Sequence, residues 1–147
     1  MAPRALVLLG YYGYGNVGDD ALCEALTAGA FAAGVERILI PCGDPARLPA
    51  DPRITPLGRF DWRALRAALR DGAVLFVGGG GLLQNITSHR SLLYYLAAIA
   101  LARRARRPYV LGFGSIGPLR GGWARALVRR AAAGAAAVGV RDQRSRD

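Results

Sequence analysis

The sequence is poor in residue types that several common classes of protein depend on. It has no lysine, one histidine and two cysteines, and Cys23 and Cys42 match no disulfide or metal-ligand spacing. We therefore expect both thiols to be small buried side chains in a reducing, cytoplasmic environment. The longest apolar run, residues 92–102, is shorter than the ~20 residues of a membrane-spanning helix. The first residues also lack the pattern of a secretory signal.

All basic residues of the chain are arginines. The 20 arginines outnumber the 10 acidic residues, which gives a net charge of +10. The lack of lysine beside abundant alanine is typical of a GC-rich genome. The arginines are scattered along the predicted helices without interleaved aromatic residues, which argues against a nucleic-acid partner. An anionic small substrate, or peripheral contact with an anionic membrane surface, explains the charge as well, because arginine forms forked contacts with phosphate and carboxylate.

Short apolar runs alternate with longer amphipathic segments. The 147 residues fit a single domain, and the 52% hydrophobic composition supports a sizeable core. We expect strands at residues 5–9, 36–40, 53–57, 73–77, 109–113 and 136–140, and helices from residue 19 and over 61–70, 90–107 and 122–134. This alternation predicts an α/β fold, a doubly wound, Rossmann-like parallel sheet with helices on both faces. Glycine-rich loops follow three of the strands, so all three loops are expected at the carboxyl edge of the sheet, where ligands bind.

The first of these loops has glycine at positions 10, 13, 15 and 18, interrupted by three tyrosines and Asn16. We expect Asp19 to cap the following helix, whose first N–H groups would be free to meet an anion. Residues 13–18 satisfy the G-x-G-x-x-G pattern, so a dinucleotide-binding oxidoreductase domain is an alternative. Three features weaken it: residues 10–12 separate the pattern from the strand, Asp19 and Asp20 follow it, and no acid closes the second strand. A purely structural glycine turn explains poorly why three aromatic residues share this loop.

The second loop begins with four consecutive glycines, residues 78–81. Four glycines raise the entropic cost of folding, which is understandable where side chains would obstruct a ligand. Gln84 and Asn85 can hydrogen-bond sugar hydroxyls, whereas Thr87 or Ser88 can equally cap the next helix. His89, the only histidine, is interpreted as a surface or capping residue.

Two groups of arginines receive different interpretations. The arginines at 103, 104, 106 and 107 crowd a predicted helix C-terminus, where the helix dipole favours cations, and we expect a solvated basic end that could lie near membrane phosphates. Arg141 follows the last predicted strand directly, near Ser145, where its guanidinium could hold a phosphate or carboxylate. The alternative for Arg141 is a surface pair with Asp142.

Four segments in order, GYYGYGNVGDDAL, GGGGLLQNITSHRSLLYYL, GFGSIGPL and VRDQRS, resemble the polysaccharide pyruvyl transferase family, and most closely its bacterial cell-wall, CsaB-like branch. The resemblance implies transfer of pyruvyl from phosphoenolpyruvate to two hydroxyls of an N-acetylmannosamine-type sugar, forming a cyclic ketal. The acceptor would be lipid-linked, and no cofactor or metal would be needed. It further implies a glycosyltransferase-B-like architecture of two Rossmann-like halves, of which residues 1–147 match the N-terminal half. The oligomeric state stays open.

The resemblance also assigns residues. The first loop would contact the acceptor sugar, with Tyr12 and Tyr14 as a stacking face, and Arg141 would bind the phosphoenolpyruvate anion. The catalytic histidine of the family belongs to the C-terminal half and is not matched by His89, so we expect this chain to be a fragment that is inactive alone. The full set of expected substrate-binding residues is Tyr12, Tyr14, Asn16, Gly18, Asp19, Gly79, Gly80, Gln84, Ser88, Arg90, Gly114, Arg141 and Ser145.

Overall fold

The computed structural model describes residues 2–79, 82–83, 89–114 and 118–140, without the side chains of residues 113, 114 and 140. Its strands are β1 (Ala5–Leu9), β2 (Arg37–Cys42), β3 (Ile54–Gly58), β4 (Val74–Gly78), β5 (Tyr109–Gly114) and β6 (Ala137–Val140). Its helices are α1 (Val17–Ala32), α2 (Trp62–Arg70), α3 (His89–Arg104) and α4 (Gly122–Gly134), with a short 3-10 helix at Pro45–Arg47. Each element expected from the sequence is present, with bounds shifted by a few residues.

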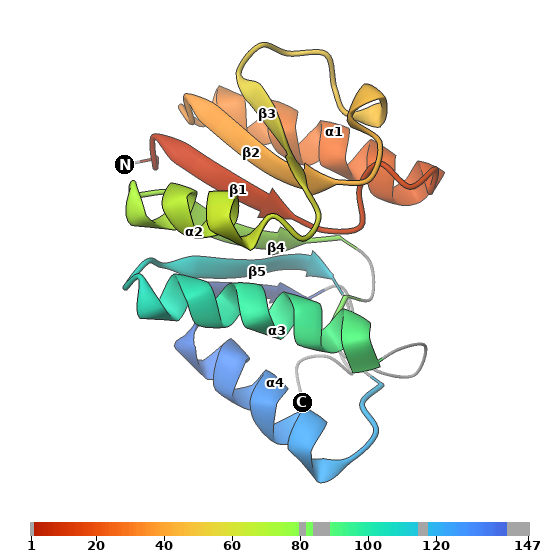
Figure 1. Cartoon of the computed structure of the whole chain (residues 1–147), viewed down its shortest axis with the longest axis vertical. Coiled ribbons are helices and arrows are strands. Elements are labelled where there is room, and N and C mark those ends of the chain that lie inside the picture. Colours follow the sequence, from red (N-terminus) through yellow and green to blue (C-terminus); the bar gives the residue numbers. More distant parts are fainter. Residues whose placement is uncertain (1, 80–81, 84–88, 115–117, 141–147) are drawn as a thin grey trace.

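The strands form one parallel sheet in the order β3-β2-β1-β4-β5-β6 (Figure 1). The chain moves outward from β1 to β3 and then crosses back to β4, so the strand order reverses between β1 and β4. This is the order of Rossmann-like doubly wound sheets, in which ligands bind outside the carboxyl ends of the strands at the point of reversal. The predicted fold class is confirmed, and the loops after β1, β4 and β5 all leave the sheet at the same edge.

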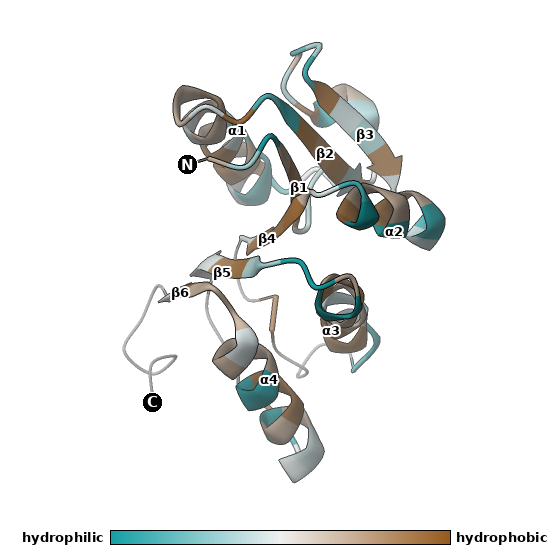
Figure 2. Cartoon of the chain, turned by 90° about the vertical axis from the view of Figure 1, so that its left-hand side faces the viewer, coloured by the Kyte–Doolittle hydropathy of each residue, from teal (hydrophilic) through white to brown (hydrophobic). Residues whose placement is uncertain are grey.

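Helices cover both faces of the sheet because alternate residues of each central strand point to opposite sides. On one face α1 packs over β1 and β2, where Cys23 joins a core cluster with Leu8 and Ile40. On the other face α2, α3 and α4 lie together (Figure 2), and Leu69 and Ile99 belong to the larger core cluster. Both cysteines are buried and free, as expected. None of the described helices combines the length and the apolarity needed to cross a bilayer.

The end of β2 differs from the sequence prediction. The strand continues through Pro41 to Cys42, whereas a proline-rich loop was expected from residue 41. Pairing with β1 runs only as far as Leu39, so the missing N–H of Pro41 lies beyond it, while the pairing with β3 continues to Cys42.

The end of α3 also differs, because the helix stops at Arg104 and not at residue 107. Arg106 adopts a left-handed φ of 54°, and Arg107 turns back so that its guanidinium donates to the carbonyls of Gly72 and Ala73 before β4. The basic end predicted here is therefore only partly solvated: Arg103 and Arg104 are exposed, but Arg107 is half-buried and bonded.

Candidate functional site at the carboxyl edge of the sheet

The helix that follows the first loop is capped by Asn16, and the prediction that Asp19 is the cap is wrong. The Asn16 side-chain oxygen accepts from the backbone N–H groups of Gly18 (3.1 Å) and Asp19 (3.3 Å). Asparagine is as good a cap as aspartate, so the helix begins before the pair of acids. Asp19 and Asp20 then occupy its first turn, where the helix dipole favours negative charge.

This cap changes the expected role of the helix start. Two of its first N–H groups are bonded to Asn16, and two carboxylates stand beside them, so the start of α1 is not the open anion site expected from the sequence. Asp20 is itself engaged, because its carboxylate accepts from the Gly13 N–H at 2.9 Å. A dinucleotide pyrophosphate would meet carboxylates here instead of free donors, which argues against the oxidoreductase alternative.

Tyr12 is not part of an exposed stacking face, and that expectation is wrong. Its ring is fully buried against the α1 side of the sheet, and its hydroxyl donates to the carbonyl oxygen of Gly78 at the end of β4. Burial, together with the nearby Cys23 and Asp19, raises the pKa of the Tyr12 phenol. The Tyr12 side chain therefore links the first loop to the end of β4.

Several glycines of the first loop serve internal packing and not ligand approach. A Cβ at Gly10 would lie 2.4 Å from the Tyr12 ring and 2.5 Å from the Gly78 oxygen. Gly13 has a φ of 80°, and a Cβ there would meet the backbone of Asp44 at 2.9 Å. Backbone hydrogen bonds from Gly43 and Asp44 to Tyr12 and Gly13 fix the loop against the end of β2. The loop is consequently held in one shape by its own chain.

The exposed aromatic face of the loop is made by Tyr11 and Tyr14. Their rings stack with centroids 4.3 Å apart and an interplanar angle of 14°, and they are 39% and 37% exposed. Of the two tyrosines expected to form a stacking face, Tyr14 is exposed, and its ring partner is Tyr11 and not Tyr12. The pair 12 and 14 was what the family resemblance implied, whereas the positive φ of Gly13 turns the loop between these two residues.

A guanidinium lies against this tyrosine pair. Arg59 directly follows β3, and its Cζ is 4.8 Å from the ring centroid of Tyr94, 5.3 Å from Tyr14, 5.6 Å from Tyr11 and 5.7 Å from Phe60. Cation–π contacts of this kind contribute from about 0.5 to about 2 kcal/mol each. The backbone of Arg59 is also held, because the Tyr94 hydroxyl donates to its carbonyl at 2.7 Å.

The charge of Arg59 is set by this environment. Burial acts to lower the pKa of the guanidinium, but hydrogen bonding and charge interaction with the Tyr14 phenol outweigh it, so the pKa is raised. Conversely, burial is the main cause that raises the pKa of Tyr94 to about 12, against the opposing effect of Arg59. The guanidinium of Arg59 therefore stays positively charged beside these rings.

The second loop approaches the first at the β1–β4 junction. A Cβ at Gly79, whose φ is 136°, would lie 3.7 Å from an Asp19 carboxylate oxygen and 3.9 Å from the Tyr12 hydroxyl. The structure thus brings Gly79 and Asp19, both expected site residues, together. Gly114 ends β5 at the same edge. Gly80, Gln84, Ser88, Arg141 and Ser145 lie outside the described residues, so their assignments stay predictions.

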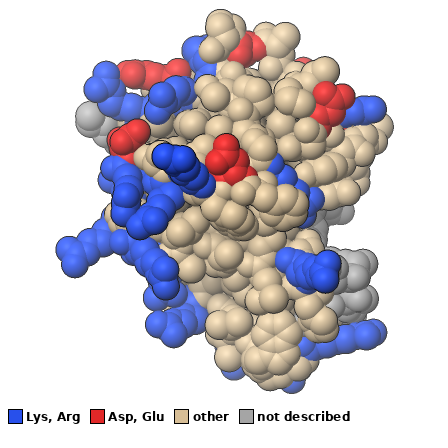
Figure 3. Space-filling view, in the orientation of Figure 1, with Lys and Arg blue, Asp and Glu red and all other residues tan. Residues whose placement is uncertain are grey.

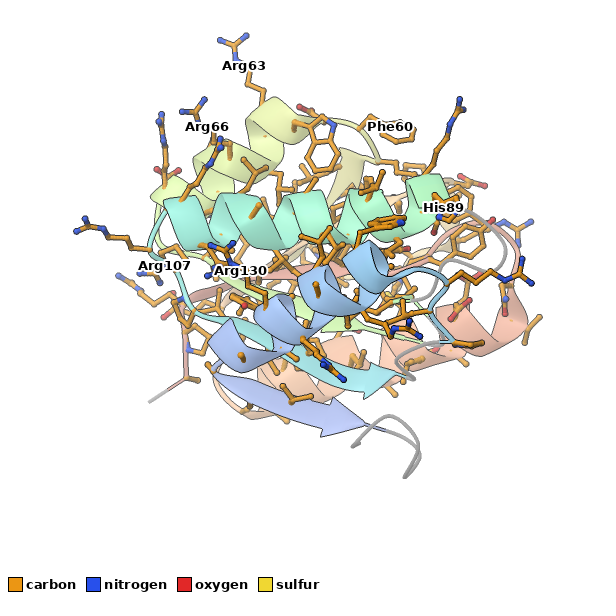
Figure 4. All side chains as sticks on the ribbon, turned by 90° about the horizontal axis from the view of Figure 1, so that it is seen from below. Phe60, Arg63, Arg66, His89, Arg107 and Arg130 are labelled. Carbon is orange, nitrogen blue, oxygen red and sulfur yellow. The ribbon has the colours of Figure 1, made fainter. Side chains whose placement is uncertain are left out.

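The first turn of α3 supplies the remaining expected residue. Arg90 is exposed there, next to His89, at the end of the helix that lies nearest this edge. The His89 ring lies 5.5 Å from that of Trp123 at the start of α4, and Figure 4 shows His89 and Phe60 at the same end of the molecule. Among the described residues, no three His, Cys, Asp or Glu side chains gather as a metal site would need.

Together these observations define a Rossmann-like α/β domain with a candidate binding site at the carboxyl edge. A comparison with family models matches residues 16–147 to the polysaccharide pyruvyl transferase family. The chain therefore belongs to this family, which confirms the resemblance at family level. Comparisons with curated proteins and with solved structures gave no match. The matched range starts at Asn16, after the Tyr11–Tyr14 pair.

Proposed function

We propose that the chain is the acceptor-side domain of a CsaB-like enzyme that transfers pyruvyl from phosphoenolpyruvate to a lipid-linked N-acetylmannosamine-type sugar of a cell-wall polysaccharide precursor. Membership of the pyruvyl transferase family carries this proposal. A sheet with its strand-order reversal beside two glycine-rich loops supports it further, because that edge is where such folds bind ligands.

The chemistry that this function requires starts with protonation of the donor. A general acid delivers a proton to C3 of phosphoenolpyruvate, which makes C2 electrophilic, and the first sugar hydroxyl adds there with loss of its proton. The second hydroxyl then displaces inorganic phosphate from C2 and closes the ketal. Donor and acceptor must both be held. We assign the donor anion to Arg141, and the acceptor sugar to the first loop and the start of α1, with Tyr14, Gly18 and Asp19, together with Gly79 of the second loop.

Two experiments test the proposal. In an active enzyme that contains this sequence, Arg141→Ala should reduce phosphoenolpyruvate-dependent release of inorganic phosphate by orders of magnitude, while Arg120→Ala serves as the control. Mass spectrometry of the acceptor should detect the ketal with the unchanged enzyme and with Arg120→Ala, and little of it with Arg141→Ala. Normal turnover of the Arg141→Ala enzyme would refute the donor assignment. We expect the chain by itself to form no ketal, because the general acid is assigned to a second half of the enzyme.

We also propose that the arginines at the amino edge of the sheet, opposite the acceptor site, make peripheral contact with an anionic membrane surface. In Figure 3 basic side chains gather at the side from which the strands start, and Figure 4 places Arg66 and Arg107 at the end away from Phe60. The exposed arginines of the α2 and α3 C-terminal ends are Arg66, Arg70, Arg103, Arg104 and Arg106. Anionic headgroups attract such a surface by ~1 kcal/mol per basic residue. Co-sedimentation with phosphatidylglycerol vesicles, and not with phosphatidylcholine vesicles, is the expected result.

A further inference from the structure

The position of Arg59 is unusual among the arginines that the structure describes. Only Arg59 and Arg107 are partly buried, and the others are exposed. Arg107 donates to two backbone carbonyls, whereas the Nε of Arg59 is buried with no hydrogen-bond partner among the described residues. Leaving a buried donor of a charged group unpaired is unfavourable, so this arrangement indicates that Arg59 has a role in ligand binding and not only in packing.

The two ends of β3 offer an internal comparison. Arg53, just before the strand, lies 3.7 Å from the Phe31 ring centroid and also pairs with the Asp51 carboxylate at 2.7 Å. Arg59, just after the strand, lies over four aromatic rings, and no described carboxylate pairs with it. The guanidinium at the amino edge is thus neutralised within the chain, while the one at the ligand edge keeps its charge available.

The neighbouring aromatic surface has the properties of a sugar platform. Tyr11 and Tyr14 present stacked, partly exposed rings, and Phe60, whose ring also lies near the Arg59 guanidinium, is 69% exposed. The hydrogen bonds that fix the first loop to the end of β2 hold the tyrosine pair in place before any ligand binds. A pre-formed aromatic face suits the C–H face of a sugar ring, which phosphoenolpyruvate does not have.

We infer that Arg59 and the stacked Tyr11–Tyr14 pair form a subsite for an anionic sugar. The tyrosine rings take the sugar ring, and the guanidinium takes a phosphate or carboxylate attached to it, with the forked geometry that arginine favours. This inference rests on the proposed function, in which the first loop binds the acceptor. It adds that the acceptor carries negative charge next to the ring that the tyrosines hold.

Saturation-transfer NMR with the purified chain tests the inference. The probes are N-acetylmannosamine, its 1-phosphate, and N-acetylmannosaminuronic acid, with phosphoenolpyruvate as competitor. We expect at least one anionic sugar to bind about 10-fold more tightly than the neutral sugar, and Arg59→Met to remove that preference while changing the neutral-sugar affinity less than about 2-fold. Arg53→Met is the matched control and should leave all affinities unchanged. The phosphate and carboxylate probes distinguish the two sources of charge.

The outcomes separate the two proposals. Equal binding of neutral and anionic sugars, unchanged in Arg59→Met, overturns the role of Arg59 but leaves the acceptor site in place. Binding of no sugar by the folded chain overturns both. If phosphoenolpyruvate displaces the sugar phosphate and itself loses affinity in Arg59→Met, the guanidinium serves the donor and the inference is wrong. Tyr14→Phe is a second variant that tests the inference if Arg59→Met does not fold. It keeps the ring, removes the hydroxyl beside Arg59, and should weaken the binding of the anionic probes only.

Discussion

The hydroxyl of Tyr12 provides a sharp test of how the site is built. In Tyr12→Phe the ring stays in its buried position, but the Gly78 carbonyl at the end of β4 loses its donor. A buried acceptor left unpaired costs ~1–3 kcal/mol, so we expect the free energy of unfolding to fall by about 2 kcal/mol. For a domain of this size, that corresponds to a decrease of about 4–8 °C in the melting temperature.

Thermal and urea unfolding of three proteins measure this effect. Tyr11→Phe is the matched control, because it removes a hydroxyl from a partly exposed ring in the same loop and should change the free energy of unfolding by less than ~0.5 kcal/mol. The urea m-values should be unchanged, since neither substitution alters the surface exposed on unfolding. If Tyr12→Phe is as stable as Tyr11→Phe, the hydroxyl does not connect the two loops and the reasoning fails.

Further predictions concern the helix start, the loop glycine and a buried thiol. Asn16→Ala should destabilise the chain by ~1 kcal/mol and Asn16→Ser should restore most of it, as urea unfolding can check; equal stability of all three would reject the cap. Gly10→Ala should destabilise strongly because its Cβ meets the Tyr12 ring, whereas Gly29→Ala, in open space on α1, should stabilise by ~0.5–1 kcal/mol. Burial raises the pKa of Cys23 to about 12, so the unfolded chain releases this proton first. Stability should therefore fall from about pH 9 upward, by up to ~1.4 kcal/mol per pH unit, and Cys23→Ala should reduce that slope.

The sequence was sufficient to predict the sheet because its signals are local and repeated. Apolar runs of strand length, each followed by an amphipathic segment, leave little choice but a parallel sheet covered on both faces. The cap of α2 follows an equally local rule, because Asp61 directly precedes the helix and its side chain accepts from the Ala64 N–H. The prediction that Asp19 caps α1 failed because Asn16, Asp19 and Asp20 are all suitable caps. Only the geometry of the loop decides among them.

The candidate site was harder to predict for a different reason. Arg59 and Phe60 lie between β3 and α2, and Tyr94 lies in α3, and no spacing in the sequence brings these residues to the first loop. The sequence offers one signal for this group of residues, which is that Arg59 directly follows a strand and so lies at the ligand edge of the sheet. The sequence pattern also does not predict which tyrosine is buried. The Tyr12 ring packs in the core because Gly10 has no side chain in its way, and this packing depends on a turn at Gly13.

The fit between Gly10, Tyr12 and the Gly78 carbonyl has a consequence for how this family can vary. Residues 10 and 12 cannot vary independently: a side chain at residue 10 demands a smaller one at residue 12, and that loss leaves the Gly78 carbonyl without its donor. Substitutions there should be tolerated only in combination. In a set of natural homologues, residues 10 and 12 would then covary, while the exposed ring of Tyr11 stays free to diversify with the molecule it meets.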